Sequence, residues 1–263
     1  MTLEIQRRLL EHLAPAARDR LAADIRIGLG YTAVRLDSGH AGLAWTPGSD
    51  AASCTHFRGA GTLVGQPAGA LLAFLLDEKA DLARAIGLAT ANALLASLPQ
   101  PITSREEVVS TLGVTAGDRV AMVGYFGPLV SGLKATGCRL DILELRPHPG
   151  ETLPPDQGRE ALARCDVALL TGTSLINGTC DGLLASLGRA RAAVLLGPSA
   201  PLCPEVFAGT GITHLAGARV REPDAVLRIV SEGGGTMILK KHLDMLTAPT
   251  GGVRDDRGRA AGQ

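Results

Sequence analysis

Three stretches of the chain share one plan and decide its fold: Val120-Ala-Met-Val-Gly124-Tyr-Phe-Gly-Pro128, Val167-Ala-Leu-Leu-Thr-Gly172-Thr-Ser-Leu-Ile-Asn-Gly-Thr179 and Ala193-Val-Leu-Leu-Gly197-Pro-Ser-Ala-Pro201. In each, an apolar run meets a glycine and continues through a small polar or proline-marked loop into a predicted helix. Continuous Val, Leu and Ile runs are typical of strands buried on both faces, and a helix directly after such a strand implies a parallel sheet with crossover helices. Because such sheets bind ligands at the carboxyl ends of their strands, the three loops predict the place of a ligand site.

The alternation of strands and helices extends over most of the second half of the chain. Strands are expected at 119–123, 140–145, 167–170, 193–196 and 213–216, and helices at 129–136, 158–164, 180–189, 224–231 and, briefly, near 204–207. This order is typical of a doubly wound α/β domain with a parallel sheet. Pro99 and Pro101 interrupt the preceding helix pattern, so we place a domain boundary there.

The first domain, 1–101, is expected to contain an amphipathic helix near the start, a β-hairpin and two further helices. The hairpin pairs residues 24–36 with 40–46 around the turn Asp37-Ser38-Gly39, and the helices cover 68–76 and 79–98. The second domain covers 102–248, and the Gly-, Arg- and Asp-rich segment 249–263 is expected to be a disordered tail.

The composition limits the compartment and the partners that we expect. The chain has 263 residues, and its 26 basic and 26 acidic residues cancel, which gives no electrostatic reason to expect nucleic acid or a membrane as partner. The five cysteines are odd in number and widely spaced, without a C-x-x-C pair, which favours a reducing cytoplasm. Neither a signal core nor a membrane-spanning run is recognised.

The first loop resembles a dinucleotide-binding turn only in part. Its G-x-x-G-P spacing differs from G-x-G-x-x-G, and Tyr125 and Phe126 add bulk where that turn must be thin, so classical NAD binding is not expected. Glu144 follows Gly124 by 20 residues, which is where a ribose-binding acid would stand. An ordinary surface carboxylate paired with Arg146 explains Glu144 equally well.

The other two loops carry the remaining candidate side chains. Hydroxyls and an amide are concentrated between Thr171 and Thr179, where they could serve a polar ligand, or where Asn177 and Thr179 could cap the next helix while Asp181 suits its positive end. Two prolines fix the backbone around Ser199, but the G-x-S-x-G pattern of a nucleophilic serine is missing.

Side chains suited to metal binding are scattered along the sequence. No spacing among them demands a metal site, so no metal ligand is assigned and most are expected to be structural. The scattered candidates are His40, Cys54, His56, His148, Cys180, Cys203 and His214.

Six motifs together resemble a known family. They are Gly30-Tyr-Thr-Ala-Val34, Gly87-Leu-Ala-Thr-Ala-Asn-Ala93, Val123-Gly-Tyr-Phe-Gly-Pro128, Glu144-Leu-Arg-Pro147, Thr171-Gly-Thr-Ser-Leu-Ile-Asn-Gly-Thr179 and Gly197-Pro-Ser-Ala-Pro201. The chain is similar, up to about Leu246, to the heavy-metal chelation family. That resemblance implies a smaller α+β enolase-N-terminal-like domain followed by a Rossmann-like α/β domain, with a site in the cleft between them. It also implies that the three loops face the first domain and that Tyr31, Thr32 and Asn92 approach from the other side.

Three functions follow as alternatives. The first is binding of a heavy-metal ion or metal chelate in the cleft; the second is an enzyme acting on a small anionic or nucleotide-like ligand at the strand ends; the third is a scaffold module. Packing explains Tyr31 and a buried amide explains Asn92 as readily as a site role, and the helix at 79–98 could serve a homo-oligomer as easily as a core. The candidate ligand-binding residues are Tyr31, Thr32, Asn92, Gly124, Tyr125, Phe126, Glu144, Thr171, Gly172, Thr173, Asn177, Thr179, Gly197, Pro198 and Ser199.

Overall fold

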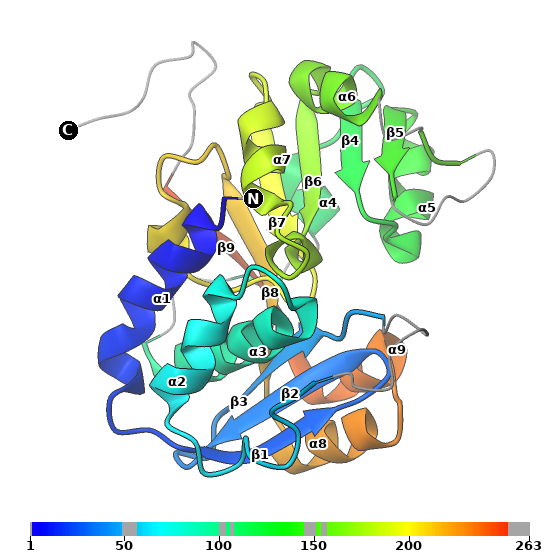
Figure 1. Ribbon diagram of the computed structural model, residues 1–263. Helices are drawn as coiled ribbons and strands as arrows, with labels where there is room; N and C mark the ends of the chain where they lie inside the picture. The colour runs from blue at the N-terminus through cyan, green and yellow to red at the C-terminus, as the bar shows by residue number, and fades with distance from the viewer. Residues whose placement is uncertain are drawn as a thin grey trace.

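The computed structural model describes residues 2–48, 57–99, 104–105, 108–144, 151–153 and 157–251. The two sheets of the described chain are stacked one above the other in Figure 1, with helices packed around each. No described helix is long and apolar enough to cross a membrane.

The N-terminal part is a three-stranded antiparallel sheet covered by helices. Its elements are α1 (Glu4–Ala17), β1 (Ala22–Ile27), β2 (Tyr31–Leu36), β3 (Ala41–Trp45), α2 (Ala68–Leu72), the 3-10 helix η1 (Ala73–Leu76) and α3 (Asp81–Ser97). The predicted hairpin around Asp37-Ser38-Gly39 is confirmed for β2 and β3, but its expected first strand, 24–36, is wrong in extent. Residues 24–36 divide into two strands because the chain turns at Gly28-Leu29-Gly30, where the Gly28 amide donates to the Tyr31 carbonyl at 2.9 Å.

The C-terminal part is a six-stranded sheet in the order β5-β4-β6-β7-β8-β9, parallel except for β9. Its elements are α4 (Val108–Leu112), β4 (Arg119–Val123), α5 (Gly127–Thr136), β5 (Arg139–Leu143), α6 (Gly158–Arg164), β6 (Val167–Thr171), η3 (Gly172–Leu175), α7 (Cys180–Ser186), β7 (Ala192–Leu196), η4 (Pro204–Phe207), β8 (His214–Val220), α8 (Pro223–Ser231), α9 (Thr236–Leu239), η5 (Lys240–His242) and β9 (Leu243–Pro249). The predicted strand and helix alternation is confirmed, with shifts of a few residues at the ends. The expected fold class, a Rossmann-like sheet after a smaller α+β part, is therefore confirmed.

Strand β9 was not predicted, and it extends the sheet into the segment expected to be a tail. Pro249 is the register partner of His214, and the Thr250 hydroxyl donates to the carbonyl of Ile212 at 2.5 Å. Residues 252–263 lie outside the described residues.

Helix α3 lies in the centre of the N-terminal part and packs directly on β3. A Cβ atom at Gly42 of β3 would come within 2.2 Å of the backbone nitrogen of Ala93 and 2.3 Å of the carbonyl oxygen of Ala89. Strand and helix backbones therefore touch, and only glycine fits between them. This contact explains why α3 is buried over most of its length.

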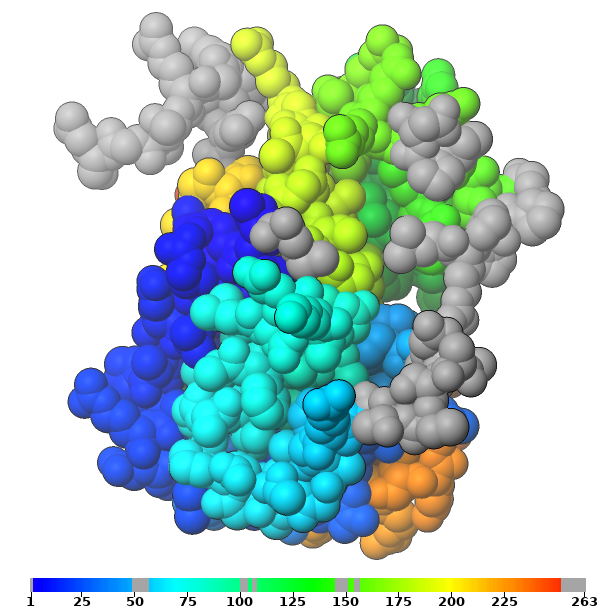
Figure 2. All heavy atoms as spheres, in the orientation of Figure 1, coloured from blue at the N-terminus to red at the C-terminus, as the bar shows by residue number. Residues whose placement is uncertain are grey.

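Helix α1 belongs to the first part by sequence but also packs against the C-terminal part. Figure 2 shows its dark blue atoms against the yellow and yellow-green atoms of that part. Asp181 of α7 accepts hydrogen bonds from the amides of Glu4 at 2.7 Å and Ile5 at 3.3 Å, and the buried Gln6 side chain donates to the carbonyl of Leu175 at 2.8 Å. We expected Asp181 to serve its own helix; it completes the N-terminus of α1 as well.

Helix α8 belongs to the C-terminal part by sequence but packs against the N-terminal part. It follows β8 of the large sheet yet packs against β1 and β2 of the small one, at the bottom of Figure 1. Its Val226 and Val230 are fully buried in one cluster with Tyr31 and Ala33 of β2. Each part of the chain thus packs a helix against the other part: α1 against η4 and α7, and α8 against β1 and β2.

Candidate functional site

A cleft of about 460 Å³ opens at the carboxyl ends of β4, β5 and β6. This volume is in the range of pockets that hold small organic ligands. Its lining consists of Trp45, Val123, Gly124, Tyr125, Phe126, Leu143, Glu144, Leu153, Thr171, Thr173, Asn177, Thr179 and Leu183.

The strand order explains why the cleft is there. From β4 the chain crosses to β5 on one side, and then returns past β4 to β6 on its other side. The loops after β4 and β6 therefore leave the sheet in opposite directions, which opens a crevice at this switch point. The loop after β7 lies one strand further on, so only two of the three predicted loops line the cleft.

Gly124 brings the two lining loops together. Its φ angle is +91°, and a Cβ atom there would lie 3.0 Å from Cβ of Thr171 and 3.3 Å from the Phe126 ring. A side chain would meet both a left-handed backbone and a close neighbour. The glycine therefore allows the β4 loop to turn against β6.

Glu144 is held in the cleft by the β4 loop. Its Oε2 accepts a hydrogen bond from the Tyr125 amide at 2.9 Å, so the carboxylate lies beside the sharp turn at Gly124. The Tyr125 hydroxyl donates to Glu151 at 2.9 Å, and Lys134 lies 3.2 Å from that carboxylate. The hydrogen bond to Glu151 raises the pKa of Tyr125, which keeps this phenol protonated.

The hydroxyl groups after β6 form a bonded series along the other wall. The Thr171 and Thr173 hydroxyls lie 3.0 Å apart, and Oδ1 of Asn177 accepts from the amide and the hydroxyl of Thr179 at 3.1 and 2.7 Å. The alternative that Thr179 caps α7 is wrong for its side chain, which makes no capping bond there because it is bonded to Asn177. The wall thus presents oxygen atoms in a fixed arrangement.

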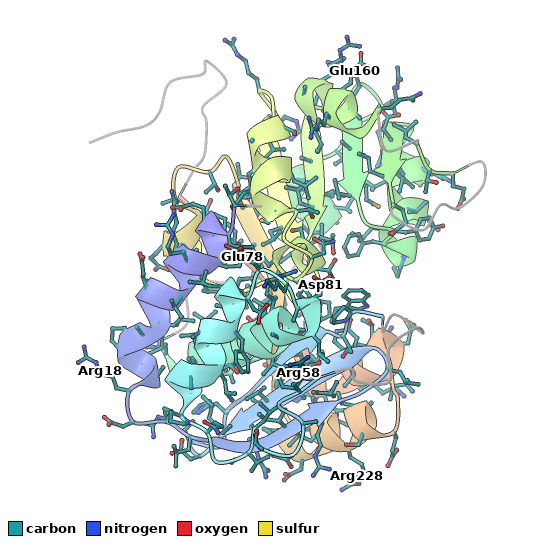
Figure 3. The ribbon with its side chains drawn as sticks, in the orientation of Figure 1. Arg18, Arg58, Glu78, Asp81, Glu160 and Arg228 are labelled. Atoms are coloured by element: carbon teal, nitrogen blue, oxygen red, sulfur yellow. The ribbon has the colours of Figure 1, made fainter. Side chains whose placement is uncertain are left out.

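The loop after β6 is also fastened to the N-terminal part. The Arg84 side chain of α3 is 1% exposed, and its guanidinium donates to the carbonyl of Ile176 and to Asp81. Figure 3 labels Asp81 at the start of α3, beside this loop. Together with the Gln6 contact, this buried arginine fixes the position of the cleft wall.

Ser199 and Asn92 connect the two parts instead of lining the cleft. Ser199 is buried, and its Oγ accepts from the Trp45 amide at 2.8 Å. The Asn92 amide donates to the carbonyls of Leu43 at 2.7 Å and Ser199 at 3.5 Å. These bonds connect the end of β3, at Leu43 and Trp45, to the loop after β7 that carries Ser199.

The other predicted residues lie away from the cleft lining. The Tyr31 hydroxyl is bonded to Thr236 at 2.7 Å, and the buried Thr32 hydroxyl to that of Thr46 at 2.9 Å. Burial raises the pKa of Tyr31. Gly172 is packed against the backbone of Ala200, Gly197 lies beside the Phe126 ring, and neither they nor Pro198 are among the lining residues.

Five lining residues were not predicted: Trp45, Val123, Leu143, Leu153 and Leu183. The only available signal was Trp45, the one tryptophan of the chain, placed at the end of an expected strand. The apolar residues read as core in the sequence, since only their position at strand and helix ends exposes them.

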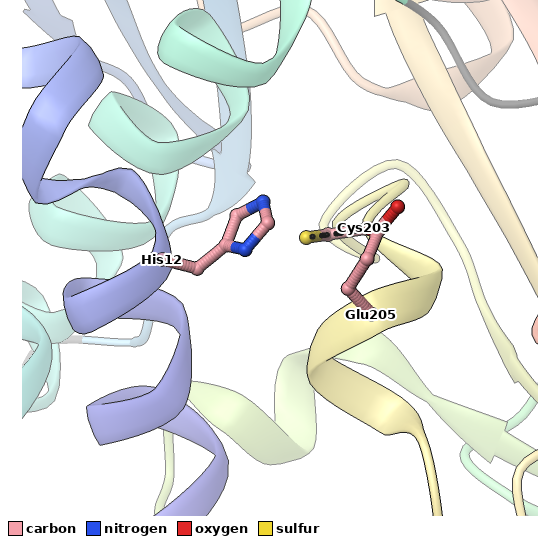
Figure 4. Close-up of side chains that lie close together, drawn as sticks. All are labelled: His12, Cys203 and Glu205. Carbon is pink, nitrogen blue, oxygen red and sulfur yellow. Dashed lines mark hydrogen bonds between the residues drawn. The ribbon is translucent and has the colours of Figure 1, made fainter.

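Three side chains of types that can bind metals lie close together outside the cleft. His12 of α1 and Cys203 and Glu205 around η4 place their ligand atoms within 4.8 Å of one another, the only such group found among the described residues (Figure 4). Burial and the charge of Glu205 raise the pKa of Cys203 to about 12, and its thiol donates to Glu205 at 3.5 Å. Cys203 was a candidate, whereas His12 and Glu205 were missed; Cys54, His56 and His148 lie outside the described residues.

Two family models with the description "Putative heavy-metal chelation" match the chain, one over residues 107–247 and one over residues 10–95. An uncharacterized protein of Methanocaldococcus jannaschii is 30% identical over 126 residues, which make up 46% of this chain and 48% of that protein. The match therefore spans about half the length of this curated relative.

Two solved structures resemble the whole chain. Both are proteins of unknown function from the family that matches residues 107–247. The Pyrococcus horikoshii protein has a TM-score of 0.81 at 20% identity and covers 93% of this chain and 99% of its own. The Desulfitobacterium hafniense DCB-2 protein has a TM-score of 0.79 at 24% identity, with 94% and 98% covered. At these identities the likeness shows the fold.

Proposed function

Since the chain belongs to the family described as putative heavy-metal chelation, we propose that it binds a metal in its interdomain cleft, carried as a small metal chelate. The observation behind this proposal is the cleft at the switch point of the large sheet, where Glu144 and the hydroxyls after β6 lie among apolar side chains. Ligands of open α/β sheets bind at this place.

The donor atoms of the lining favour a chelate over a bare heavy-metal ion. Soft metal ions prefer thiolate and imidazole ligands. The described lining residues offer a carboxylate, hydroxyls and amide oxygen, but no cysteine or histidine. The apolar side chains around them, among them Trp45, Phe126 and Leu183, would cover the organic part of a chelate.

The charge of the lining also favours a metal chelate as the ligand. Glu144 is the one ionisable carboxylate among the described lining residues, and no lysine or arginine is among them. Such a site attracts a neutral or positively charged ligand. The alternative, an enzyme acting on a small anionic or nucleotide-like ligand, is less favoured, because the described part of the lining offers no basic side chain to bind phosphate or carboxylate groups.

Native mass spectrometry of untagged full-length protein, purified without chelator, tests this proposal. We expect an excess mass that corresponds to a metal with an organic ligand, and that disappears after denaturation. A metal-free organic mass would favour the enzyme alternative. Apo protein alone, at concentrations where the cleft should be filled, would contradict tight binding of a chelate.

A matched pair of variants assigns the bound mass to the cleft. We expect Glu144→Gln to lower the bound fraction by an affinity loss of roughly tenfold, equivalent to about 1.4 kcal/mol. The control is Glu160→Gln, since Glu160 is exposed on α6 at the far end of this part in Figure 3 and forms an exposed ion pair with Arg164. Equal losses in both variants would exclude the cleft as the site.

A further inference from the structure

His12, Cys203 and Glu205 meet where α1 packs against η4 (Figure 4). Their ligand atoms all lie within 4.8 Å of one another, and none of the three lines the cleft. Residues so far apart in the sequence come together only because α1 is docked on the C-terminal part. The group is therefore a product of the folded molecule and not of a local sequence motif.

The three side chains form a donor set of recognisable chemistry. A thiolate, an imidazole and a carboxylate are all ligands of zinc, and zinc sites with three protein ligands hold water in the fourth position. Metal bonds of about 2.0–2.3 Å place neighbouring donors of a tetrahedron roughly 3.3–3.8 Å apart. The separation of 3.5 Å between Sγ of Cys203 and Oε2 of Glu205 is already in that range.

The side chains of His12 and Glu205 have room to move closer to Cys203, as metal binding requires. Cys203 is 1% exposed and lies just before η4, so its sulfur is fixed, whereas His12 and Glu205 are exposed and can change rotamer. Arg8 on the preceding turn of α1 donates to the carbonyl of Ala208 at 3.4 Å, which keeps α1 beside the end of η4. A shift of about 1 Å in the two exposed side chains is a rotamer adjustment.

We propose that His12, Cys203 and Glu205 form a second site, which binds a zinc-class divalent cation such as Zn²⁺ or Cd²⁺ and joins α1 to η4. This inference does not rest on the proposed function of the cleft. On binding, the thiol proton of Cys203 passes to solvent, and the hydrogen bond between the thiol and Glu205 is replaced by one metal–sulfur and one metal–oxygen bond. The imidazole supplies the third bond, and water the fourth.

Cobalt(II) is a suitable probe, because a bound thiolate gives it a charge-transfer absorption that oxygen and nitrogen ligands alone do not. When cobalt(II) is titrated into the full-length reduced protein, we expect this absorption to saturate at one equivalent of cobalt. Zn²⁺ should then displace the cobalt and remove the absorption. Cys203→Ala should abolish the absorption, and His12→Gln and Glu205→Gln should each weaken binding at least tenfold. The ion should raise the melting temperature of the wild type and not that of Cys203→Ala, since it binds only the folded state.

Cys165→Ala and His40→Gln are matched controls, because Cys165 is equally buried and His40 equally exposed but neither belongs to the group. Cys54→Ala and His56→Gln test another thiol and imidazole, which stand two residues apart in the sequence. All four should bind cobalt as the wild type does. An absorption that survives Cys203→Ala, a wild-type affinity in His12→Gln, or no charge-transfer absorption at a roughly tenfold excess of cobalt would each overturn the assignment.

The two metal proposals are separable by one comparison. Glu144→Gln should leave cobalt binding at the second site unchanged, and His12→Gln should leave the bound mass in the cleft unchanged. Loss of both signals in either variant would contradict two independent sites.

Discussion

Gly124 is the residue on which the shape of the cleft depends most directly. It occupies a left-handed backbone conformation at φ +91°, against Thr171 of the neighbouring strand. A Cβ atom there costs about 1–2 kcal/mol for the backbone conformation alone. The position therefore tests whether the cleft needs the tight β4 turn.

We predict that Gly124→Ala lowers the free energy of unfolding by about 1–2 kcal/mol and weakens ligand binding in the cleft. The control is Gly132→Ala: Gly132 lies in α5 with no atom near its Cβ position, so alanine should stabilise by about 0.5–1 kcal/mol. Urea unfolding measures both. If the free energy of unfolding changed with the same sign in both variants, the left-handed backbone conformation of Gly124 would not be the cause of the loss of stability.

At this scale the sequence predicted the polar residues of the cleft lining together with Gly124 and Phe126, and it missed Trp45 and four aliphatic residues. Thr171 ends β6 and Glu144 directly follows β5, so the position of each residue along the chain indicates its place at the edge of the sheet. Trp45 reaches the cleft from the other sheet, and His12 reaches Cys203 from a helix at the opposite end of the chain. Contacts between distant segments have no period in the sequence, so only the structure could show them.

Helix α1 illustrates how an element can depend on a distant side chain. Its N-cap residue, Leu3, offers no capping side chain, and Asp181 of α7 accepts from two of its first amides instead. A carboxylate at this end also interacts favourably with the helix dipole. The cap therefore both completes the helix and docks it.

We predict that Asp181→Ala lowers the free energy of unfolding by about 1–2 kcal/mol and speeds hydrogen exchange of the amides at the start of α1. Asp19→Ala is the control, since Asp19 is exposed just beyond the end of α1. Its effect should stay within about 0.5 kcal/mol. Unchanged exchange at Glu4 and Ile5 in Asp181→Ala would argue against the capping role.

Strands buried inside the parallel sheet could be predicted from the sequence, whereas the strands at a bend or at the edge of a sheet could not. Buried parallel strands such as β6 and β7 are continuous apolar runs, and both were identified. The sequence predicts one strand over 24–36, although 13 residues exceed the usual strand length of about five to six. Strand β9 has mixed polarity because it closes the edge of the sheet, so its pairing with β8 decides its conformation.

At the scale of the whole molecule, Asp244 fastens the connection between the two parts to the edge of the large sheet. It is 5% exposed and lies 3.0 Å from Arg105, 3.2 Å from Arg219 and 3.6 Å from Arg221. Burial raises the pKa of this carboxyl, but the hydrogen bond from Arg219 and the charges of the three guanidinium groups hold it below its ordinary value.

A lowered pKa in the folded state means that the carboxylate stabilises the fold above the unfolded pKa of about 4, and that this stabilisation is lost as the pH falls through the folded value. We predict that Asp244→Asn lowers the free energy of unfolding by about 1–3 kcal/mol at neutral pH, and that the difference from the wild type shrinks below about pH 4. Asp224→Asn is the control, because Asp224 is 85% exposed in its ion pair with Arg35. A pH-independent difference for Asp244→Asn would contradict an electrostatic role.

The class of the molecule followed from the order of its segments, but the way its halves interlock did not. Amphipathic helices such as α1 and α8 show in the sequence which face is apolar, without showing which sheet that face covers. The boundary at residue 101 remains a prediction, since residues 100–103 lie outside the described residues.

The packing of α1 and α8 against the other half of the chain also affects the order in which the protein can fold during translation. A ribosome adds roughly 5–20 residues per second, and domains usually fold as they emerge. The small sheet is complete once Trp45 has been made, but the helix that covers it ends at Ser231. The face of the small sheet that α8 covers must therefore stay exposed for roughly 10–40 s during synthesis, even though α3 can already pack on that sheet.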